Sequence, residues 1–288
     1  MSDPVLVAAV QMCSSDDVGA NLATVRRLGD EAAAAGARVI VLPENFAFLG
    51  RKEGDKLAIA EAVDGDRPGP IIEALRELAD RHRAVVIGGG MAELVPGDDR
   101  RTYNTAVVVA PGAGVIARYR KVHLFDVDIP GGATLRESDG TAAGDGALVV
   151  ATAGLRLGVT ICYDVRFPEL YRRLWKEGGA DVLLVPAAFT AHTGRAHWHL
   201  LLRARAVENQ AYVVAAAQWG RHNEKRESFG HTLIVDPWGT IVGERADGDG
   251  VVIAAIDREL LARTRRNMPV HQHAVTLVSA PALTVVEA

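Results

Sequence analysis

The chain has 288 residues, of which 49% are hydrophobic and 24% are charged, and its formal net charge at pH 7 is −4. These values are typical of a globular protein with one large or two modest domains. The absence of a basic excess argues against a nucleic-acid partner or an anionic membrane surface, and so favours chemistry on a small molecule.

The N-terminus reads Met-Ser-Asp-Pro and lacks a basic stretch followed by an apolar one, so we expect no signal peptide. No apolar run is long enough to cross a bilayer. The two cysteines, Cys13 and Cys162, are too few for a disulfide framework or a cysteine-rich metal site. Together these features predict a cytoplasmic protein, with Cys13 in the core just after a strand at 5–11.

The next elements place an acidic residue at a sheet edge. Apolar residues at helical spacing predict a helix over 21–35, and a strand over 38–42 ends at Pro43. Glu44 therefore lies just beyond the carboxyl end of a buried strand, which is where sheets with parallel strands bind ligands. A helix over 70–83 and a strand over 84–88 follow.

A predicted hairpin, with strands over 103–110 and 114–119, leads directly to Lys121. A glycine-rich loop then runs to residue 146 and contains Glu137. Loops of this length are uncommon in compact domains unless they serve a site. We therefore expect this region to contribute to function.

Cys162 ends an apolar run that is typical of a buried strand, and a helix pattern restarts at Phe167, with Pro168 suited to its first turn. The thiol is thus predicted on a strand-to-helix turn, where backbone N–H groups and the helix dipole favour the thiolate. The alternative is a buried cysteine that only fills space.

Strands and helices continue to alternate in the second half of the chain, which indicates helices covering sheets. We predict one α/β domain of two sheets with helices outside. The apolar stretches of the tail, 275–278 and 283–286, suit an edge strand or a subunit contact. The predicted elements are a strand over 147–152, a helix over 168–177, strands over 182–185 and 212–216, a helix over 197–209, a hairpin over 231–243, a strand over 251–256 and a helix over 258–266.

A nucleophilic cysteine needs a base, a donor for the developing oxyanion and a proton for the leaving group. A Cys–His dyad with His123 is one possibility. The other pairs Glu44 with Lys121, because a carboxylate at the end of an apolar strand needs a cation or a donor. Taken singly, Glu44 could instead cap a turn and Lys121 could lie on a solvated face.

Three segments resemble the signature blocks of the nitrilase superfamily, the carbon–nitrogen hydrolases: residues 42–45 (LPEN), 119–125 (YRKVHLF) and 162–169 (CYDVRFPE). Their order and spacing match the family's Glu, Lys and Cys triad. The resemblance implies a four-layer αββα sandwich of two mixed sheets with helices on the outer faces. It covers the chain to about Gln272. We therefore expect a single domain over 1–288, in which 270–288 form a C-terminal tail. We also expect the protein to be a homo-oligomer, a dimer.

The resemblance also implies roles for individual residues. Glu44 would act as general base, Lys121 and the backbone N–H of Tyr163 would hold the oxyanion, and Cys162 would attack. Glu137 resembles the second glutamate that many members place beside the triad. Water is the co-substrate, and no metal or cofactor is expected. A non-enzymatic scaffold would be expected to have lost part of the triad, which is complete here.

Residues 194–218, 220–226 and 231–240 look like the deaminated-glutathione amidase branch of this superfamily. The predicted activity is hydrolysis of a small carboxylated amide. The alternatives are an ω-amidase acting on α-ketoglutaramate, an N-carbamoyl hydrolase and a true nitrilase. Arg166 would capture a substrate carboxylate, unless it pairs with Asp164 or Glu169. The predicted substrate-binding residues are Tyr163, Arg166, Phe189 and Thr193.

Overall fold

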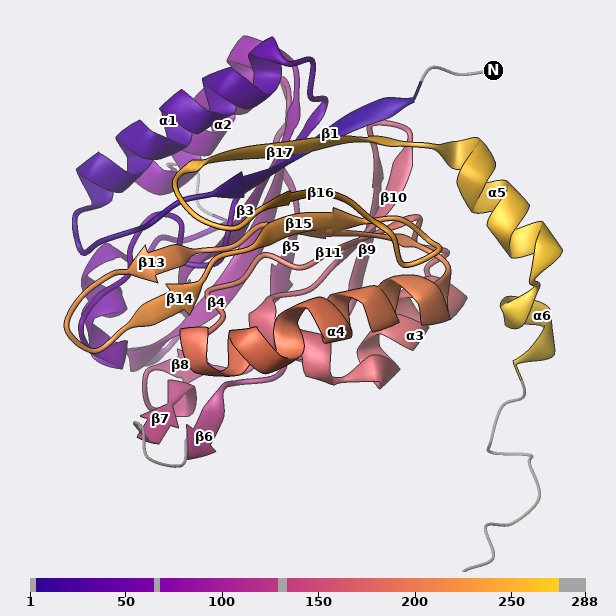
Figure 1. The fold of residues 1–288 in the computed structure, drawn as a ribbon. Coiled ribbons are helices and arrows are strands. Elements are labelled where there is room, and N and C mark those ends of the chain that lie inside the picture. Colours follow the sequence, from indigo (N-terminus) through magenta and orange to yellow (C-terminus); the bar gives the residue numbers. More distant parts are fainter. Residues whose placement is uncertain (1–3, 65–67, 129–133, 275–288) are drawn as a thin grey trace, which may run out of the picture.

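Two β-sheets pack face to face, and helices cover both outer faces (Figure 1). The computed structural model describes residues 4–64, 68–128 and 134–274. One pair of helices covers the first sheet and another pair covers the second, which confirms the predicted αββα sandwich. These helices are α1 (Val18–Ala34) and α2 (Pro70–His82) on one side, and α3 (Pro168–Lys176) and α4 (Ala191–Asn209) on the other.

The first sheet has seven strands in the order β17-β1-β2-β3-β4-β5, with β8 paired to β4. It is mixed, because β1, β2 and β3 run parallel while β17, β4 and β5 join by antiparallel pairing. Its strands are β1 (Val5–Gln11), β2 (Val39–Val41), β3 (Val85–Val95), β4 (Asp98–Ala110), β5 (Gly114–Arg120), β8 (Thr141–Ala142) and β17 (Gly250–Ile256).

The second sheet has six strands in the order β16-β15-β12-β11-β10-β9. Its centre is parallel, since β10, β11 and β12 run the same way, and antiparallel strands flank it. Its strands are β9 (Leu148–Thr152), β10 (Leu155–Val159), β11 (Val182–Leu184), β12 (Tyr212–Ala215), β15 (Thr232–Val235) and β16 (Ile241–Arg245).

The alternation of side chains along β1 separates two apolar clusters. Val7 and Ala9 pack in the cluster shared with the second sheet, whereas Ala8 and Val10 pack in the cluster beneath α1 and α2. Successive side chains on a strand point to opposite faces, so a strand buried on both faces is apolar throughout. The first cluster therefore joins the two sheets and extends to α3 and α4.

Several elements differ from the predictions. β3 continues to Val95 rather than ending at Gly88, and α4 begins at Ala191 rather than His197. The predicted loop after Lys121 contains short ordered elements, and two further polar segments are ordered. These segments are rich in charge or exposed, so their side chains follow no apolar period. They are β6 (Asp126–Asp128), β7 (Thr134–Arg136), the 3₁₀ turns η2 (Glu137–Asp139) and η1 (Glu53–Ile59), and the hairpin β13 (Trp219–Arg221) with β14 (Glu227–Phe229).

The prediction that Cys13 lies in the core is wrong. β1 ends at Gln11, so Cys13 lies beyond the sheet edge, partly exposed, with its Sγ 3.4 Å from Nδ1 of His222. At the other end of the chain, α5 (Arg258–Asn267) and α6 (Val270–His273) follow β17. The predicted apolar tail segments lie outside the described residues. Within the described ranges, none of the helices combines the length and apolar character needed to cross a bilayer.

Candidate active site

Glu44 and Cys162 meet because parallel strands of both sheets end at the same edge of the sandwich. Glu44 follows β2, and Cys162 follows β10 in the facing sheet. Ala188 follows the neighbouring strand β11 and donates its backbone N–H to Glu44 Oε2 at 2.8 Å. Carboxyl ends of parallel strands are the usual place for ligands in such folds, as predicted for Glu44.

The turn that carries Cys162 is held in an uncommon backbone conformation. Cys162 has φ +48°, in the left-handed region that costs a non-glycine residue about 1 kcal/mol or more. Its backbone N–H donates to the Pro186 carbonyl at 2.8 Å, and the N–H of Ile161 donates to Asp164 Oδ2 at 2.9 Å. A 3₁₀ turn, η3 (Cys162–Arg166), follows, and Pro168 begins α3, which confirms the predicted strand-to-helix turn.

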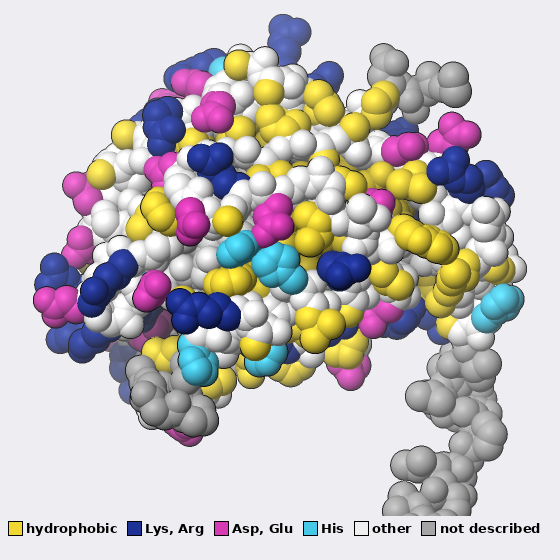
Figure 2. Space-filling view, viewed as in Figure 1, with side chains coloured by type: hydrophobic (Ala, Val, Ile, Leu, Met, Phe, Trp, Pro, Cys, Tyr) yellow, Lys and Arg dark blue, Asp and Glu magenta, His cyan; other side chains and the backbone are white. Residues whose placement is uncertain are grey.

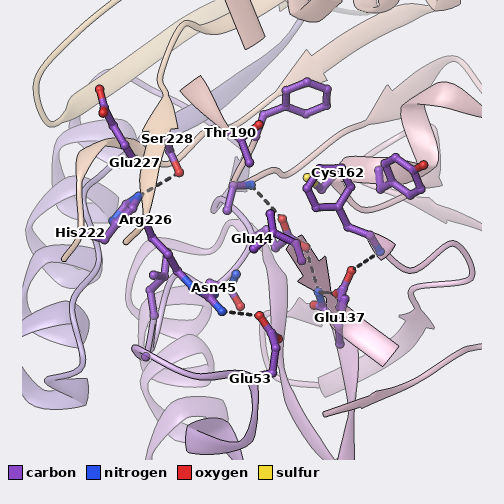
Figure 3. A pocket seen from close by; sticks show the side chains of 18 of the residues that line it. Glu44, Asn45, Glu53, Glu137, Cys162, Thr190, His222, Arg226, Glu227 and Ser228 are labelled. Carbon is purple, nitrogen blue, oxygen red and sulfur yellow. Dashed lines mark hydrogen bonds and ion pairs between the residues drawn. The ribbon is translucent and has the colours of Figure 1, made fainter. Parts of the chain in front are cut away.

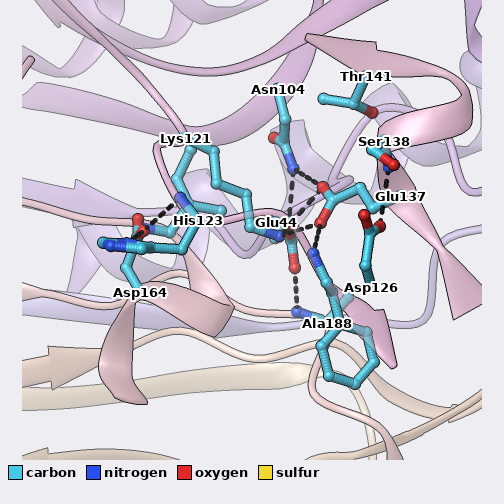
Figure 4. Close-up of polar contacts among 12 residues, drawn as sticks. Glu44, Asn104, Lys121, His123, Asp126, Glu137, Ser138, Thr141, Asp164 and Ala188 are labelled. Atoms are coloured by element: carbon cyan, nitrogen blue, oxygen red, sulfur yellow. Dashed lines mark hydrogen bonds and ion pairs between the residues drawn. The ribbon is translucent and has the colours of Figure 1, made fainter. Parts of the chain in front are cut away.

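Lys121 bridges two carboxylates beside the thiol (Figure 4). Its Nζ lies 3.0 Å from Glu44 Oε1 and 2.8 Å from Glu137 Oε2. The Lys121 side chain is only 2% exposed, and Glu44 and Glu137 are buried as well. Burying charges is tolerated only when each is paired and hydrogen-bonded, as these are.

Asn104 completes this cluster and was not predicted from the sequence. Its Nδ2 donates to Glu44 Oε1 at 2.8 Å and to Glu137 Oε1 at 3.3 Å. Gly90, at φ +135°, leaves room for it, because a Cβ there would lie 2.6 Å from Asn104 Oδ1. Asn104 lies where the buried half of β4 begins, and a single amide in a strand gives no sequence signal of the carboxylates that it contacts.

In this cluster, burial and the neighbouring charges act in opposite directions on the pKa of Lys121 and on that of Glu137. Burial lowers the pKa of Lys121, but Glu137 and Glu44 outweigh it and hold that pKa well above its ordinary value. Burial opposes ionisation of Glu137, yet Lys121 and Lys56 bring the pKa of Glu137 down to about 2. Lys121 and Glu137 are therefore both charged at neutral pH.

The Cys162 thiol has a different environment from the one that the sequence predicted. Burial, and then the negative charge of Glu44, raise the pKa of Cys162 well above its ordinary value, although Lys121 opposes the shift. The thiol is thus the resting form rather than the thiolate, because the dehydrated site penalises a second anion beside Glu44. Such a nucleophile needs a base when it attacks.

His123 is held in another network. Its Nδ1 lies 2.7 Å from Asp164 Oδ1 (Figure 4). Its ring stacks on that of Phe167, with the ring centroids 3.6 Å apart. Tyr119 donates its hydroxyl to the other oxygen of Asp164 at 2.7 Å. His123 is not among the described residues that line the cavity, so the geometry favours Glu44 as the partner of Cys162.

Cys162, Glu44, Lys121 and Glu137 open onto a cavity of about 430 Å³, a size suited to a drug-sized ligand (Figure 3). Three of the four predicted substrate-binding residues line it: Tyr163, Phe189 and Thr193.

Arg166 lies behind Tyr163 and Phe189 and is not among the described residues that line the cavity. Its guanidinium carbon is 5.7 Å from the ring centroid of Tyr163 and 5.1 Å from that of Phe189. Its Nη1 lies 3.3 Å from His197 Nδ1. Neither Asp164 nor Glu169 forms a salt bridge with Arg166 in the part of the chain that the structure describes.

The cavity also has basic residues that were not among the predicted site residues, and they lie on or next to η1 and in the turn of the β13–β14 hairpin. They are Lys52, Lys56, His222, Lys225 and Arg226. Elsewhere, His199, His231 and Glu244 have the spacing of metal ligands, but they do not line the cavity.

Comparison with known proteins identifies the family. The model of the carbon-nitrogen hydrolase family matches residues 6–266. A Synechocystis protein named deaminated glutathione amidase is 46% identical, over 94% of this chain and 98% of its own length. The crystal structure of the C. elegans NitFhit protein superposes with a TM-score of 0.86 at 40% sequence identity. The match covers 95% of this chain and 65% of that one.

A third match is the structure of Saccharomyces cerevisiae Nit3, described as a member of branch 10 of the nitrilase superfamily. It is 33% identical with a TM-score of 0.82, over 93% of this chain and 96% of its own. These relationships agree with the sandwich fold. The chain therefore belongs to the carbon-nitrogen hydrolase family and is an enzyme that cleaves carbon–nitrogen bonds by hydrolysis.

Proposed function

We propose that this enzyme is an amidase that hydrolyses deaminated glutathione through a thioester on Cys162. The observation that carries the mechanism is the buried Lys121, which bridges Glu44 and Glu137 beside the thiol. The substrate is inferred from the relative of that name, which matches this chain over nearly its whole length.

In the acylation step, Glu44 takes the proton of the Cys162 thiol as Sγ attacks the amide carbonyl. A C–S bond forms, and the carbonyl oxygen becomes an oxyanion held by Lys121 Nζ and by the backbone N–H of Tyr163. That N–H lies in the first turn of η3, where backbone donors have no partner within the helix. Collapse of the intermediate breaks the C–N bond, and Glu44 gives its proton to the departing amine.

In the deacylation step, water enters the position that the amine has left. Glu44, again ionised, takes a proton from the water as the oxygen attacks the thioester carbonyl. The same donors hold the second oxyanion, and the C–S bond breaks to release the acid and restore the thiol. Glu137 and Asn104 do not move protons in this scheme; they hold Lys121 and Glu44 in place.

The acyl half of deaminated glutathione is a keto acid and ends in a carboxylate. We retain Arg166 as the candidate for its partner, although it lies behind Tyr163 and Phe189 rather than in the cavity lining, because it forms no salt bridge with Asp164 or Glu169 in the described chain. A guanidinium is well suited to binding a carboxylate through two hydrogen bonds.

The second candidate is an ω-amidase acting on α-ketoglutaramate, which would have the same acyl group. Measuring kcat/KM for deaminated glutathione, α-ketoglutaramate, a simple nitrile and an N-carbamoyl amino acid side by side separates the possibilities. We expect deaminated glutathione to be the best substrate of the four. If one of the other three compounds had a higher kcat/KM, that compound would be the substrate instead of deaminated glutathione.

The choice of base is tested with two variants. Glu44→Gln should lower the acylation rate by about 10²–10⁴-fold, the usual contribution of a general base, because an amide cannot take the thiol proton. His123→Ala should retain most of the acylation rate, since His123 bonds Asp164. The opposite pattern would establish a Cys–His dyad.

We also propose a cytoplasmic homodimer. Leu200 and Val207 on α4 and Trp238 in the nearby β15–β16 turn are exposed apolar side chains, which support a subunit contact. Sedimentation equilibrium should give twice the chain mass, and a monomer at micromolar concentration would exclude this assembly.

A further inference from the structure

The cavity has two chemically different sides. Tyr163 follows Cys162, and its ring centroid lies 4.9 Å from that of Phe125, which lines the cavity as Phe189 does. Figure 3 shows His222 and Arg226 on the other side, with Arg226 paired to Glu53. A ligand that spans the cavity therefore meets aromatic rings near the thiol and, at its far end, charged groups together with Phe48 and Leu49.

The far side carries a net positive charge although the whole chain is acidic. We name Lys52, Lys225 and Arg226 the basic rim. Among the described residues beyond the Glu44–Lys121–Glu137 cluster, four Lys and Arg side chains and two carboxylates, those of Glu53 and Glu227, line the cavity.

Two members of the rim are free to bind an anion. Lys52 and Lys225 are exposed, and neither takes part in a salt bridge with a described residue. Arg226 is more buried and already pairs with Glu53, which also lies 3.1 Å from Lys56 Nζ. In Figure 2 dark-blue side chains gather at the left edge, where Figure 1 places the turn of the β13–β14 hairpin that contains Lys225.

The position of Glu44 sets the direction in which a substrate must lie. Glu44 is the group that protonates the departing nitrogen, so the leaving group has to lie on its side of Cys162. In Figure 3 Glu44 lies between Cys162 and Arg226. The leaving group therefore extends from the thiol, past Glu44, toward the basic rim.

We infer that the basic rim binds a carboxylate at the far end of the leaving group, so that the enzyme prefers amides whose amine product is a short peptide acid over amides that release ammonia. This inference rests on the proposed function, and it adds a binding site for the amine half. Ammonium and guanidinium groups at a cavity mouth are suited to a carboxylate, which deaminated glutathione carries on its terminal glycine.

The test compares two substrates on the full-length protein: deaminated glutathione and an analogue in which the terminal carboxylate is replaced by a hydroxymethyl group. The variants are Lys225→Ala and Lys52→Ala/Lys225→Ala, with Lys225→Arg as the conservative change. Arg263→Ala on α5 is the control for net charge, because Arg263 is exposed and does not line the cavity. Arg226 is left intact, since its pair with Glu53 joins the hairpin to η1.

For deaminated glutathione we expect the double variant to raise KM about fivefold, the upper range for exposed ion pairs, with little change in kcat. Lys225→Arg and Arg263→Ala should behave as the wild type. The hydroxymethyl analogue should be a poorer substrate for the wild type, and its KM should not respond to the variants.

Equal losses on both substrates, or no change on either, would overturn the inference while leaving the proposed function in place. If the wild-type enzyme hydrolysed neither substrate but did hydrolyse α-ketoglutaramate, the proposed substrate would be wrong and the inference would fall with it. The wild-type protein alone separates failure of the inference from failure of the proposed function, because only in the second case does it not hydrolyse deaminated glutathione.

Discussion

Lys121 and Lys225 line the same cavity in opposite surroundings. Lys121 is 2% exposed and contacts two carboxylates, whereas Lys225 is exposed and takes part in no salt bridge with a described residue. Charges in a dehydrated site interact strongly and cost a great deal to unpair, while exposed charges are screened by water and salt. We call Glu44, Lys121, Glu137 and Cys162 the buried centre. The buried centre therefore suits the chemical steps, and the basic rim suits selection among substrates.

The buried centre also differs in how it is supported. Glu44 and Cys162 follow central strands of the two sheets, and Lys121 follows β5. Lys225 lies in the turn of a two-stranded hairpin. Groups on packed strand ends hold a fixed geometry, which catalysis requires, whereas surface loops adapt to different ligands.

The largest effect is expected from Cys162→Ala. Turnover should fall by at least about 10³-fold, because the thiol forms the covalent intermediate. The melting temperature should change little, since alanine is small and the turn is held by backbone bonds to Pro186 and Asp164. Steady-state kinetics and circular dichroism would check both. A variant with a tenth of the wild-type activity would show that no thioester is needed.

Lys121→Met should affect both activity and stability. Loss of an oxyanion donor lowers kcat by about 10²–10³-fold, and leaving Glu44 and Glu137 unpaired lowers the free energy of unfolding by about 3–5 kcal/mol. The double variant Lys121→Met/Glu137→Gln should recover part of the stability in urea unfolding but none of the activity. Recovery of activity would mean that Lys121 acts only by neutralising charge.

The stability that Glu137 contributes should depend on pH. Its folded-state pKa of about 2 lies below the ordinary value of 4.5, so the ionised group stabilises the fold above about pH 4.5 and this contribution disappears as pH falls through about 2. Urea unfolding should show that the wild type is more stable than Glu137→Gln at pH 7. This difference in the free energy of unfolding should shrink toward pH 2. A gap that stays constant with pH would argue against a charged Glu137.

The smallest effect concerns salt. If the basic rim attracts the substrate, kcat/KM for deaminated glutathione should fall severalfold between 0.01 and 0.5 M ionic strength, because exposed charges are screened over about 10 Å at 0.1 M. Lys52→Ala/Lys225→Ala should flatten this dependence. The same salt slope in the variant and the wild type would show that the rim does not steer substrates.

The sequence predicts the buried centre better than the rest of the cavity. Glu44 and Cys162 end apolar runs, and Lys121 follows a clear hairpin, so the residue pattern indicates both the strands and the positions after them. The sandwich follows from alternating strands and helices. Asn104 is harder to identify, because a single amide in a strand gives no sign that it contacts two carboxylates.

The rim was not among the predicted site residues, and the reason is physical. Lys52 and Arg226 lie on short polar segments without apolar periodicity, and the cavity brings these segments together only in the folded chain, through the Glu53–Arg226 pair. This pair joins residues that are 173 positions apart in the sequence, so no local sequence pattern indicates it. Cys13 was misplaced for a related reason, because β1 ends at Gln11 and the cysteine lies just beyond it.

The central claim is that Cys162 carries the acyl group during turnover. A slow amide substrate, mixed with enzyme and quenched in acid, should give an intact mass increased by the keto-acyl group, and peptide mapping should place that mass on Cys162. Cys13 serves as an internal control, since it is the only other cysteine. An adduct on Cys13, or product formation with no acyl mass on Cys162, would contradict the mechanism.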